Sequence, residues 1–216
     1  MSLRYKSHPW HGIDIGTDAP EEINVFIEIV SSDTVKYEID KVSGYLKIDR
    51  PQKFSNVCPA LYGFIPRTYC GEIVASYAGQ KAGIANLKGD GDPLDICVLT
   101  EKDIPRGDLL LKAIPIGGLR MIDQEEADDK IIAVLKDDLM YGQYDDLLTC
   151  PQSIVNRLKH YFLTYKNVPG EEAVKCHISA VYGKEEAHLV INKSQEDYIK
   201  RFGHMEEMIF DALFDV

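Results

Sequence analysis

Three aspartates lie close together in the run DGDPLD at residues 90–95. Gly91 and Pro93 favour a tight turn, so the three carboxylates would converge instead of spreading along a strand. Converging carboxylates repel one another, and a fold keeps them together only where a cation or a proton neutralises them. All-oxygen ligands favour Mg²⁺, Ca²⁺ or Mn²⁺ over Zn²⁺. The run therefore indicates either a site for a hard divalent cation or a solvated acidic turn.

An EF-hand calcium loop is the rival motif for the same residues. Such a loop needs acids at positions 1, 3, 5 and 12 and a glycine at position 6. Asp90, Asp92 and Glu101 match positions 1, 3 and 12, but Leu94 and Asp95 occupy positions 5 and 6. The flanking segments also favour strands over helices, so we reject the EF-hand.

Two further groups could act with this turn. Asp123 and Asp128 lie on a short connection between expected strands, and Lys130 begins the second of these strands. The alternative is an ordinary acidic loop. Tyr165 and Lys166 end an expected helix, where a lysine also complements the helix dipole.

Four charged residues lie on strands whose alternate positions are apolar, namely Glu28, Lys36, Glu38 and Arg50. If they face the interior of a barrel, their burial is costly unless they bind something. If they face outward, they form the solvated side of a sheet. The alternation itself allows both arrangements.

The elements that would position these residues are mostly short strands, separated by Gly or Pro. Many strands before any helix predict a closed or nearly closed antiparallel barrel within one domain, residues 1–216. Strands are expected at residues 23–30, 35–40, 45–50, 95–100, 109–115, 119–123 and 130–135.

The last third predicts helices that pack outside the barrel. A capping box at Thr149 and Gln152 begins one helix, and residues 168–170 (VPG) end it. A strand pair is expected at 173–181 and 188–191. Ser194 with Asp197 then begins a final helix, whose apolar face contains Ile199, Phe202, Ile209, Phe210 and Leu213.

Composition narrows the class of protein. The net charge of −11 argues against nucleic acid as a partner, because phosphate backbones require a basic face. The five cysteines include no C-x-x-C pair, which favours a reducing compartment. No apolar run is long enough to span a bilayer. We expect a soluble, cytoplasmic protein without a membrane partner.

The run DGDPLD resembles the D-x-D-P-x-D signature of the family I soluble inorganic pyrophosphatases. The resemblance extends from about residue 20 to about residue 168, and its other matches are residues 27–41, 43–50, 61–66, 123–130 and 160–166. Cys58 departs from the pattern, since many members carry a tyrosine four residues before the position of Tyr62. Residues 67–88 exceed the short bacterial connection and are expected to form an inserted hairpin or loop.

This resemblance implies a mainly β (α+β) fold with an OB-like, twisted five-stranded barrel and flanking helices. It also implies hydrolysis of inorganic diphosphate to two orthophosphates with Mg²⁺. The candidate acids outnumber the candidate bases seven to four. A charged substrate could therefore be held only with roughly three to four divalent cations per site. A homo-oligomer is expected, with no nucleic acid partner.

Site roles follow from the resemblance, position by position. Asp92 is the expected general base, and Tyr165 and Lys166 are expected to assist the reaction. Expected metal ligands are Glu28, Asp90, Asp92, Asp95, Asp123 and Asp128. Expected diphosphate ligands are Lys36, Glu38, Arg50, Tyr62, Lys130, Tyr165 and Lys166.

Two other functions stay open from the residues alone. One is hydrolysis of another phosphoanhydride, such as a nucleotide, against which the lack of a Gly-rich phosphate loop weighs. The other is a non-catalytic OB-type binding module. The acidic charge and the lack of an aromatic-basic stripe weigh against nucleic-acid binding by such a module.

Overall fold

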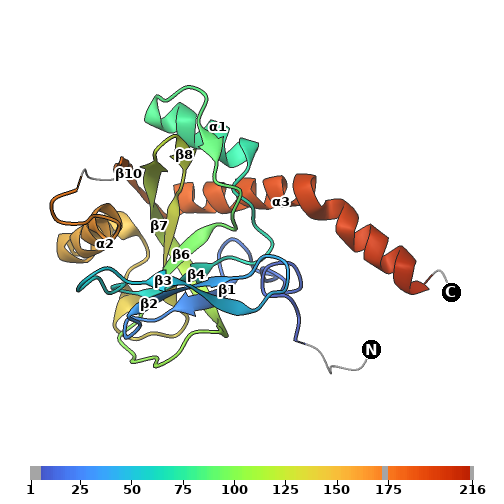
Figure 1. Cartoon of the computed structure of the whole chain (residues 1–216), viewed down its shortest axis with the longest axis horizontal. Coiled ribbons are helices and arrows are strands. Elements are labelled where there is room, and N and C mark those ends of the chain that lie inside the picture. Colours follow the sequence, from blue (N-terminus) through green and yellow to red (C-terminus); the bar gives the residue numbers. More distant parts are fainter. Residues whose placement is uncertain (1–5, 172–174, 215–216) are drawn as a thin grey trace.

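A ring of strands forms the centre of the computed structural model, which describes residues 6–171 and 175–214 (Figure 1). Within the described chain, five strands pair in a closed circuit whose last member returns to the first. All pairings are antiparallel except the parallel pair β6–β9. The strands in ring order are β1 (Ile23–Ile29), β4 (Leu61–Phe64), β6 (Asp95–Leu99), β9 (Lys130–Leu135) and β7 (Leu109–Asp123).

β7 corrects one expectation, because residues 109–115 and 119–123 belong to one long strand. In the sequence, the run from Pro115 to Gly118 indicates an interruption between two strands. In the structure it is a bend, with a register shift between Pro115 and Gly117. Gly117 has a φ of 159°, which suits a residue without a side chain. The bend lets one strand pair with β1, β9 and β10 in turn.

A separate hairpin lies beside the ring. β2 (Val35–Ile39) and β3 (Leu46–Pro51) form their own two-stranded sheet, in which Lys36 lies opposite Arg50. Both strands agree with the sequence expectation. Because the hairpin does not join the main sheet, its side chains reach the site from a separate element.

Residues 67–88, expected to form a hairpin or loop, contain a helix. Helix α1 (Glu72–Ala82) is followed by β5 (Lys88–Gly89), which pairs in parallel with β8 (Glu126–Ala127). The carboxylate of Asp197 accepts hydrogen bonds from the backbone N–H groups of residues 71, 73 and 74. It thereby satisfies amides that begin the helix. This cap comes from a distant part of the chain, so no local sequence signal predicts it.

The C-terminal third contains two larger helices and one strand. The elements are two short 3₁₀ turns (Tyr141–Gln143 and Leu147–Thr149), α2 (Gln152–Thr164), β10 (Cys176–Gly183) and α3 (Lys184–Phe214). The strand expected at 173–181 begins at Cys176, and residues 173 and 174 lie outside the described residues. The strand expected at 188–191 is wrong, since these residues belong to α3.

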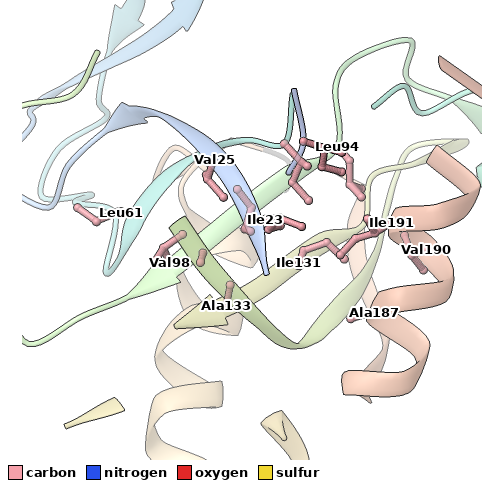
Figure 2. Packing of buried hydrophobic residues seen from close by; sticks show 14 of the residues in the cluster. Ile23, Val25, Leu61, Leu94, Val98, Ile131, Ala133, Ala187, Val190 and Ile191 are labelled. Carbon is pink, nitrogen blue, oxygen red and sulfur yellow. The ribbon is translucent and has the colours of Figure 1, made fainter. Parts of the chain in front are cut away.

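α3 begins ten residues before the expected start at Ser194. Ala187, Val190 and Ile191 are buried at helical spacing against the barrel core (Figure 2). This packing overrides the strand preference of the β-branched Val190 and Ile191. Ser194 is a buried residue within the helix, and Asp197 caps α1. Ile199, expected on the apolar face, is largely exposed. Among the described helices, none has the length and apolar character needed to cross a bilayer.

Candidate active site

Six of the thirteen predicted site residues line a narrow cleft between the hairpin and the ring. Its volume is about 70 Å³, and its polar lining residues are Glu28, Lys36, Glu38, Lys41, Tyr62, Asp92 and Asp95. A larger hollow of about 870 Å³ lies between α1 and α3, but none of the predicted site residues lines it. The smaller cleft is therefore the candidate site.

A buried cluster around Lys130, here called the floor, adjoins the cleft through Asp95. The strand that begins with Lys130 pairs with β6, so that this residue lies beside Asp95, and its ammonium group contacts both Asp95 and Asp128. The Lys130 side chain is only 3% exposed. The Tyr62 hydroxyl donates a hydrogen bond of 2.6 Å to Asp95 Oδ2. The floor is therefore a buried cluster built on adjacent strands of one sheet.

Acidic groups outnumber basic groups at this floor. Burial, together with repulsion from Asp128 and Asp95, raises the pKa of Asp90 to about 8. Burial also raises the pKa of Asp128, although Lys130 opposes the shift. Burial lowers the pKa of Lys130, but Asp128 and Asp95 outweigh it and keep that pKa well above its usual value. One lysine thus stays charged among carboxylates that it only partly neutralises.

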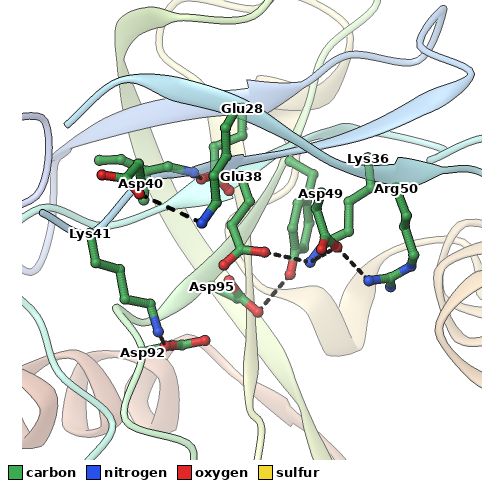
Figure 3. Close-up of polar contacts among 12 residues, drawn as sticks. Glu28, Lys36, Glu38, Asp40, Lys41, Asp49, Arg50, Asp92 and Asp95 are labelled. Carbon is green, nitrogen blue, oxygen red and sulfur yellow. Dashed lines mark hydrogen bonds and ion pairs between the residues drawn. The ribbon is translucent and has the colours of Figure 1, made fainter. Parts of the chain in front are cut away.

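The hairpin supplies the opposite wall. Lys36 Nζ lies 3.4 Å from Glu38 Oε2 and 3.2 Å from Asp49 Oδ2, and Asp49 also pairs with Arg50 (Figure 3). Arg50 is 40% exposed, in contrast to Lys130. Lys36 lines the cleft, Arg50 lies opposite it in the hairpin, and both side chains are partly exposed, so an anion can reach them from solvent.

The signature run forms the expected tight turn. The backbone N–H of Asp92 donates to Asp90 Oδ1 over 2.9 Å, and Gly91 has a φ of 76°. The N–H of Cys70 donates to the Asp92 carbonyl over 2.8 Å, which ties the turn to the segment before α1. The Asp92 carboxylate pairs with Lys41, which follows β2. Asp92 thus lies where the turn meets the hairpin.

Glu28 lines the cleft and joins the ring to the hairpin. Its Oε1 accepts a hydrogen bond of 2.6 Å from the backbone N–H of Ile39. Burial, with a contribution from nearby Asp95, raises the pKa of Glu28 to about 8. Burial therefore favours the protonated form of the Glu28 carboxyl group.

The remaining predicted residues come from the ends of β7 and α2. Lys166 pairs with Asp123, and its Nζ lies 5.5 Å from the centre of the Tyr165 ring. Tyr165 shares a small gap of about 10 Å³ with Lys36 and Tyr62, which connects this group to the other two walls. Within the described residues, Asp123 Oδ1 is buried without a hydrogen-bond partner.

These residues fit a hard divalent cation by their donor chemistry. The donors are carboxylate oxygens, the burial of several carboxylates raises their pKa values, and Asp123 Oδ1 is an unused buried acceptor. In the described parts of the chain, no three His, Cys, Asp or Glu side chains gather closely enough to hold one ion. Lysines pair with individual carboxylates, namely Lys41 with Asp92, Lys130 with Asp95 and Asp128, and Lys166 with Asp123.

Comparison with known proteins decides the family. The family model described as inorganic pyrophosphatase matches residues 25–199. The chain belongs to the inorganic pyrophosphatase family. It is therefore a hydrolase of diphosphate, and its family implies a divalent metal cofactor. The expected OB-like barrel is confirmed by the closed strand circuit and by the solved relatives.

Relatives cover nearly the whole of this pyrophosphatase. It is 54% identical to the inorganic pyrophosphatase of Chlamydia trachomatis over 200 residues, which is 91% of this chain and 96% of that protein. A solved pyrophosphatase from Helicobacter pylori is 30% identical, with a TM-score of 0.70, and the match covers 86% and 98% of the two chains. The Thermus thermophilus structure is 25% identical, with a TM-score of 0.74 and coverage of 89% and 99%.

Sequence reasoning missed two charged residues of the cleft, Lys41 and Asp49. Asp49 bridges Lys36 and Arg50, and Lys41 pairs with Asp92. Both lie next to residues that were singled out, yet neither has a spacing that distinguishes it from a solvated surface charge. Cys58 is buried beside Tyr161, and burial raises the pKa of its thiol to about 12. A nonionised, buried thiol offers no hydroxyl to the substrate.

Proposed function

We propose that this pyrophosphatase uses Mg²⁺ to hydrolyse inorganic diphosphate to two orthophosphates, with Asp92 as the general base. The observation that carries the proposal is the excess of buried carboxylates opposite accessible cations at one cleft. Asp49 and Lys41, which join the candidate residues, have opposite charges. Acidic residues of the site therefore still outnumber its basic residues by three. An anionic substrate requires further positive charge at such a site.

The accessible cations bind the phosphates. Lys36, Arg50 and Lys166 each contact a carboxylate and are partly exposed, so each can exchange that carboxylate for a phosphate oxygen. Glu38, Tyr62, Lys130 and Tyr165 complete this set. Because Arg50 and Lys36 lie on a separate hairpin, they can close on a substrate without breaking the barrel.

The carboxylates are the proposed ligands of roughly three to four Mg²⁺ ions per site with substrate bound. When bound, Mg²⁺ offsets the charge of the substrate and increases the acidity of the attacking water. The proposed ligands are Glu28, Asp90, Asp92, Asp95, Asp123 and Asp128. For Asp95 and Asp128, Lys130 holds both carboxylates in place.

Asp92 accepts the proton from the attacking water. Its carboxylate lines the cleft and is partly exposed, so water can reach it. Its backbone is fixed by the turn at Asp90 and by the contact with Cys70. Lys166 pairs with Asp123, and Tyr165 lies beside Lys36 and Tyr62; both stabilise the negative charge on the departing orthophosphate.

A phosphate-release assay tests the proposal. We expect release from diphosphate with Mg²⁺, loss of release with a chelator, and recovery when Mg²⁺ is restored. Ca²⁺ should inhibit, because it is larger and takes more ligands. Faster release from nucleoside triphosphates than from diphosphate would favour the alternative phosphoanhydride hydrolase. Full turnover in metal-free buffer would contradict the role of Mg²⁺.

We further infer a homo-oligomer in the cytoplasm. The five cysteines are free thiols, which is compatible with a reducing compartment. Exposed apolar side chains on the hairpin and the segment after it, including Val42, Tyr45 and Phe54, are candidates for a subunit contact. Light scattering of the purified protein measures the assembly, and a monomeric mass at assay concentrations would contradict it.

A further inference from the structure

Arg120 is a buried cation outside the cleft. It lies on β7 with a side chain that is 2% exposed. Its guanidinium carbon is 5.3 Å from the ring centre of Tyr77 on α1 and 5.0 Å from that of Tyr182 on β10. Two aromatic rings therefore contact one guanidinium group, an arrangement that favours a fixed orientation.

Each end of this guanidinium group contacts one carboxylate. Nη1 donates to Glu186 Oε1 over 2.8 Å, and Nη2 donates to Asp129 Oδ2 over 3.3 Å. Each carboxylate also accepts from one tyrosine: Tyr182 to Asp129 at 3.0 Å, and Tyr77 to Glu186 at 3.3 Å. The two ends are chemically alike, but they reach different parts of the protein.

The Asp129 end reaches the active site. Asp129 lies between Asp128 and Lys130, and Lys130 pairs with both Asp128 and Asp95 in the floor. Alternation along an extended chain directs Asp129 to the opposite side from its two neighbours. In the described chain, Asp129 Oδ1 has no hydrogen-bond partner, so Arg120 and Tyr182 alone hold its carboxylate.

The Glu186 end reaches only the helices. Glu186 begins α3 and contacts Tyr77 and Lys81 of α1. Helix α1 belongs to residues 67–88, and Tyr182 and Glu186 follow residue 168. The family resemblance in the sequence therefore gave no role to the segments that supply these three partners of Arg120.

We propose that Arg120 is a positioning residue for the active site, which acts through Asp129 to fix the backbone at residues 128–130. The carboxylate of Asp128 and the ammonium group of Lys130 are thereby held against Asp95. A backbone hydrogen bond also holds this segment, since the N–H of Asp128 donates to the Met121 carbonyl over 3.0 Å. Arg120 and Met121 are adjacent, so one stretch of β7 holds the segment twice. The inference rests on the proposed roles of Asp128 and Lys130.

The two similar ends provide a matched test. Asp129→Asn and Glu186→Gln each change one carboxylate partner of Arg120 to an amide, and Arg120→Met removes both contacts. We expect all three to lower the thermal unfolding midpoint. Asp129→Asn and Arg120→Met should also lower kcat by about 10–100-fold, as found for residues that orient metal ligands. Glu186→Gln should keep the kcat of the unchanged protein.

A second readout does not depend on turnover. Binding of imidodiphosphate in the presence of Mg²⁺, measured by calorimetry, should weaken in Asp129→Asn and Arg120→Met but not in Glu186→Gln. Equal kcat and equal binding in all three variants would overturn the positioning role. Equal losses in Asp129→Asn and Glu186→Gln would also overturn it, because they would show a general effect of destabilisation.

The tyrosines decide the question if the charge variants do not fold. Tyr182→Phe removes the hydroxyl that contacts Asp129, and Tyr77→Phe removes the one that contacts Glu186, while both keep the ring on Arg120. We expect a lower kcat only in Tyr182→Phe, and equal kcat in both would overturn the inference. Asp128→Asn tests the underlying assignment. Full activity of Asp128→Asn would contradict the proposed role of Asp128. If Asp128→Asn is inactive while Arg120→Met keeps normal activity, only the positioning role is contradicted.

Discussion

The floor of the cleft and its hairpin wall both carry charged residues, but they hold them differently. Lys130 and Asp95 lie on paired strands of the barrel, and Lys130 is almost fully buried. Lys36 and Arg50 lie on a two-stranded hairpin and are partly open to solvent. The same types of ion pair are therefore fixed in the floor and exchangeable in the hairpin wall.

This difference assigns separate tasks to the two walls. A buried ion pair cannot lose one partner without leaving an uncompensated charge, so the floor must keep its geometry. Exposed pairs contribute little to stability, so the hairpin can exchange its carboxylate partners for phosphate at small cost. We expect changes in the floor to affect stability and activity together, and changes in the hairpin to affect substrate binding.

The largest expected effect is at Asp92, where the two walls meet. Asp92→Asn should lose roughly 10²–10⁴-fold in kcat, because an amide cannot take a proton from water. Added Mg²⁺ should not restore the rate, whereas higher pH should restore part of it. Asp95→Asn in the floor should instead recover part of its activity at higher Mg²⁺. Steady-state kinetics in Mg²⁺ and pH titrations measure both variants, and the opposite pattern would mean that the two roles are reversed.

A matched pair of lysines tests the two walls directly. Lys130→Met should lower the free energy of unfolding by up to about 3–5 kcal/mol, because Asp95 and Asp128 lose their buried partner. Lys36→Met should change it by about 1 kcal/mol or less, and should mainly raise KM for diphosphate. Urea unfolding in chelator, beside kinetics in Mg²⁺, gives both quantities. Similar losses of stability in the two variants would contradict the distinction between the walls.

The most gradual expected effect is the pH dependence from Glu28, which connects the floor to the hairpin. Its pKa of about 8 in the folded protein lies above the usual 4.5, so the folded state binds this proton more tightly. The stabilisation is complete below pH 4.5 and is lost as the pH rises from 4.5 to about 8. The slope is at most about 1.4 kcal/mol per pH unit.

Glu28→Gln isolates this contribution. Asp90 titrates in a similar range, so the difference between the unchanged protein and the variant is the informative quantity. Denaturant unfolding in chelator from pH 4.5 to 8.5 should show a shallower decline for Glu28→Gln. Parallel curves would mean that Glu28 is not the source of the slope.

The sequence by itself determined the turn at residues 90–95, the strands of the hairpin and most strands of the barrel. Their signals are local: Gly91 and Pro93 favour a turn, and residues 35–39 alternate with a period of two. Spacing also singled out Lys130 and Asp128 as candidates. It could not show that Lys130 contacts Asp95, since that contact depends on the parallel pairing of β6 with β9.

Tertiary structure alone decided the features whose causes lie far apart in the chain. Helix α1 is capped by Asp197, and α3 extends through residues 188–191 because Val190 and Ile191 pack against the barrel. Arg120 finds its partners on β10, α1 and α3 and at Asp129, none of which its neighbours in sequence reveal. Local patterns report the preference of a few residues, whereas burial and charge pairing depend on which segments meet after folding.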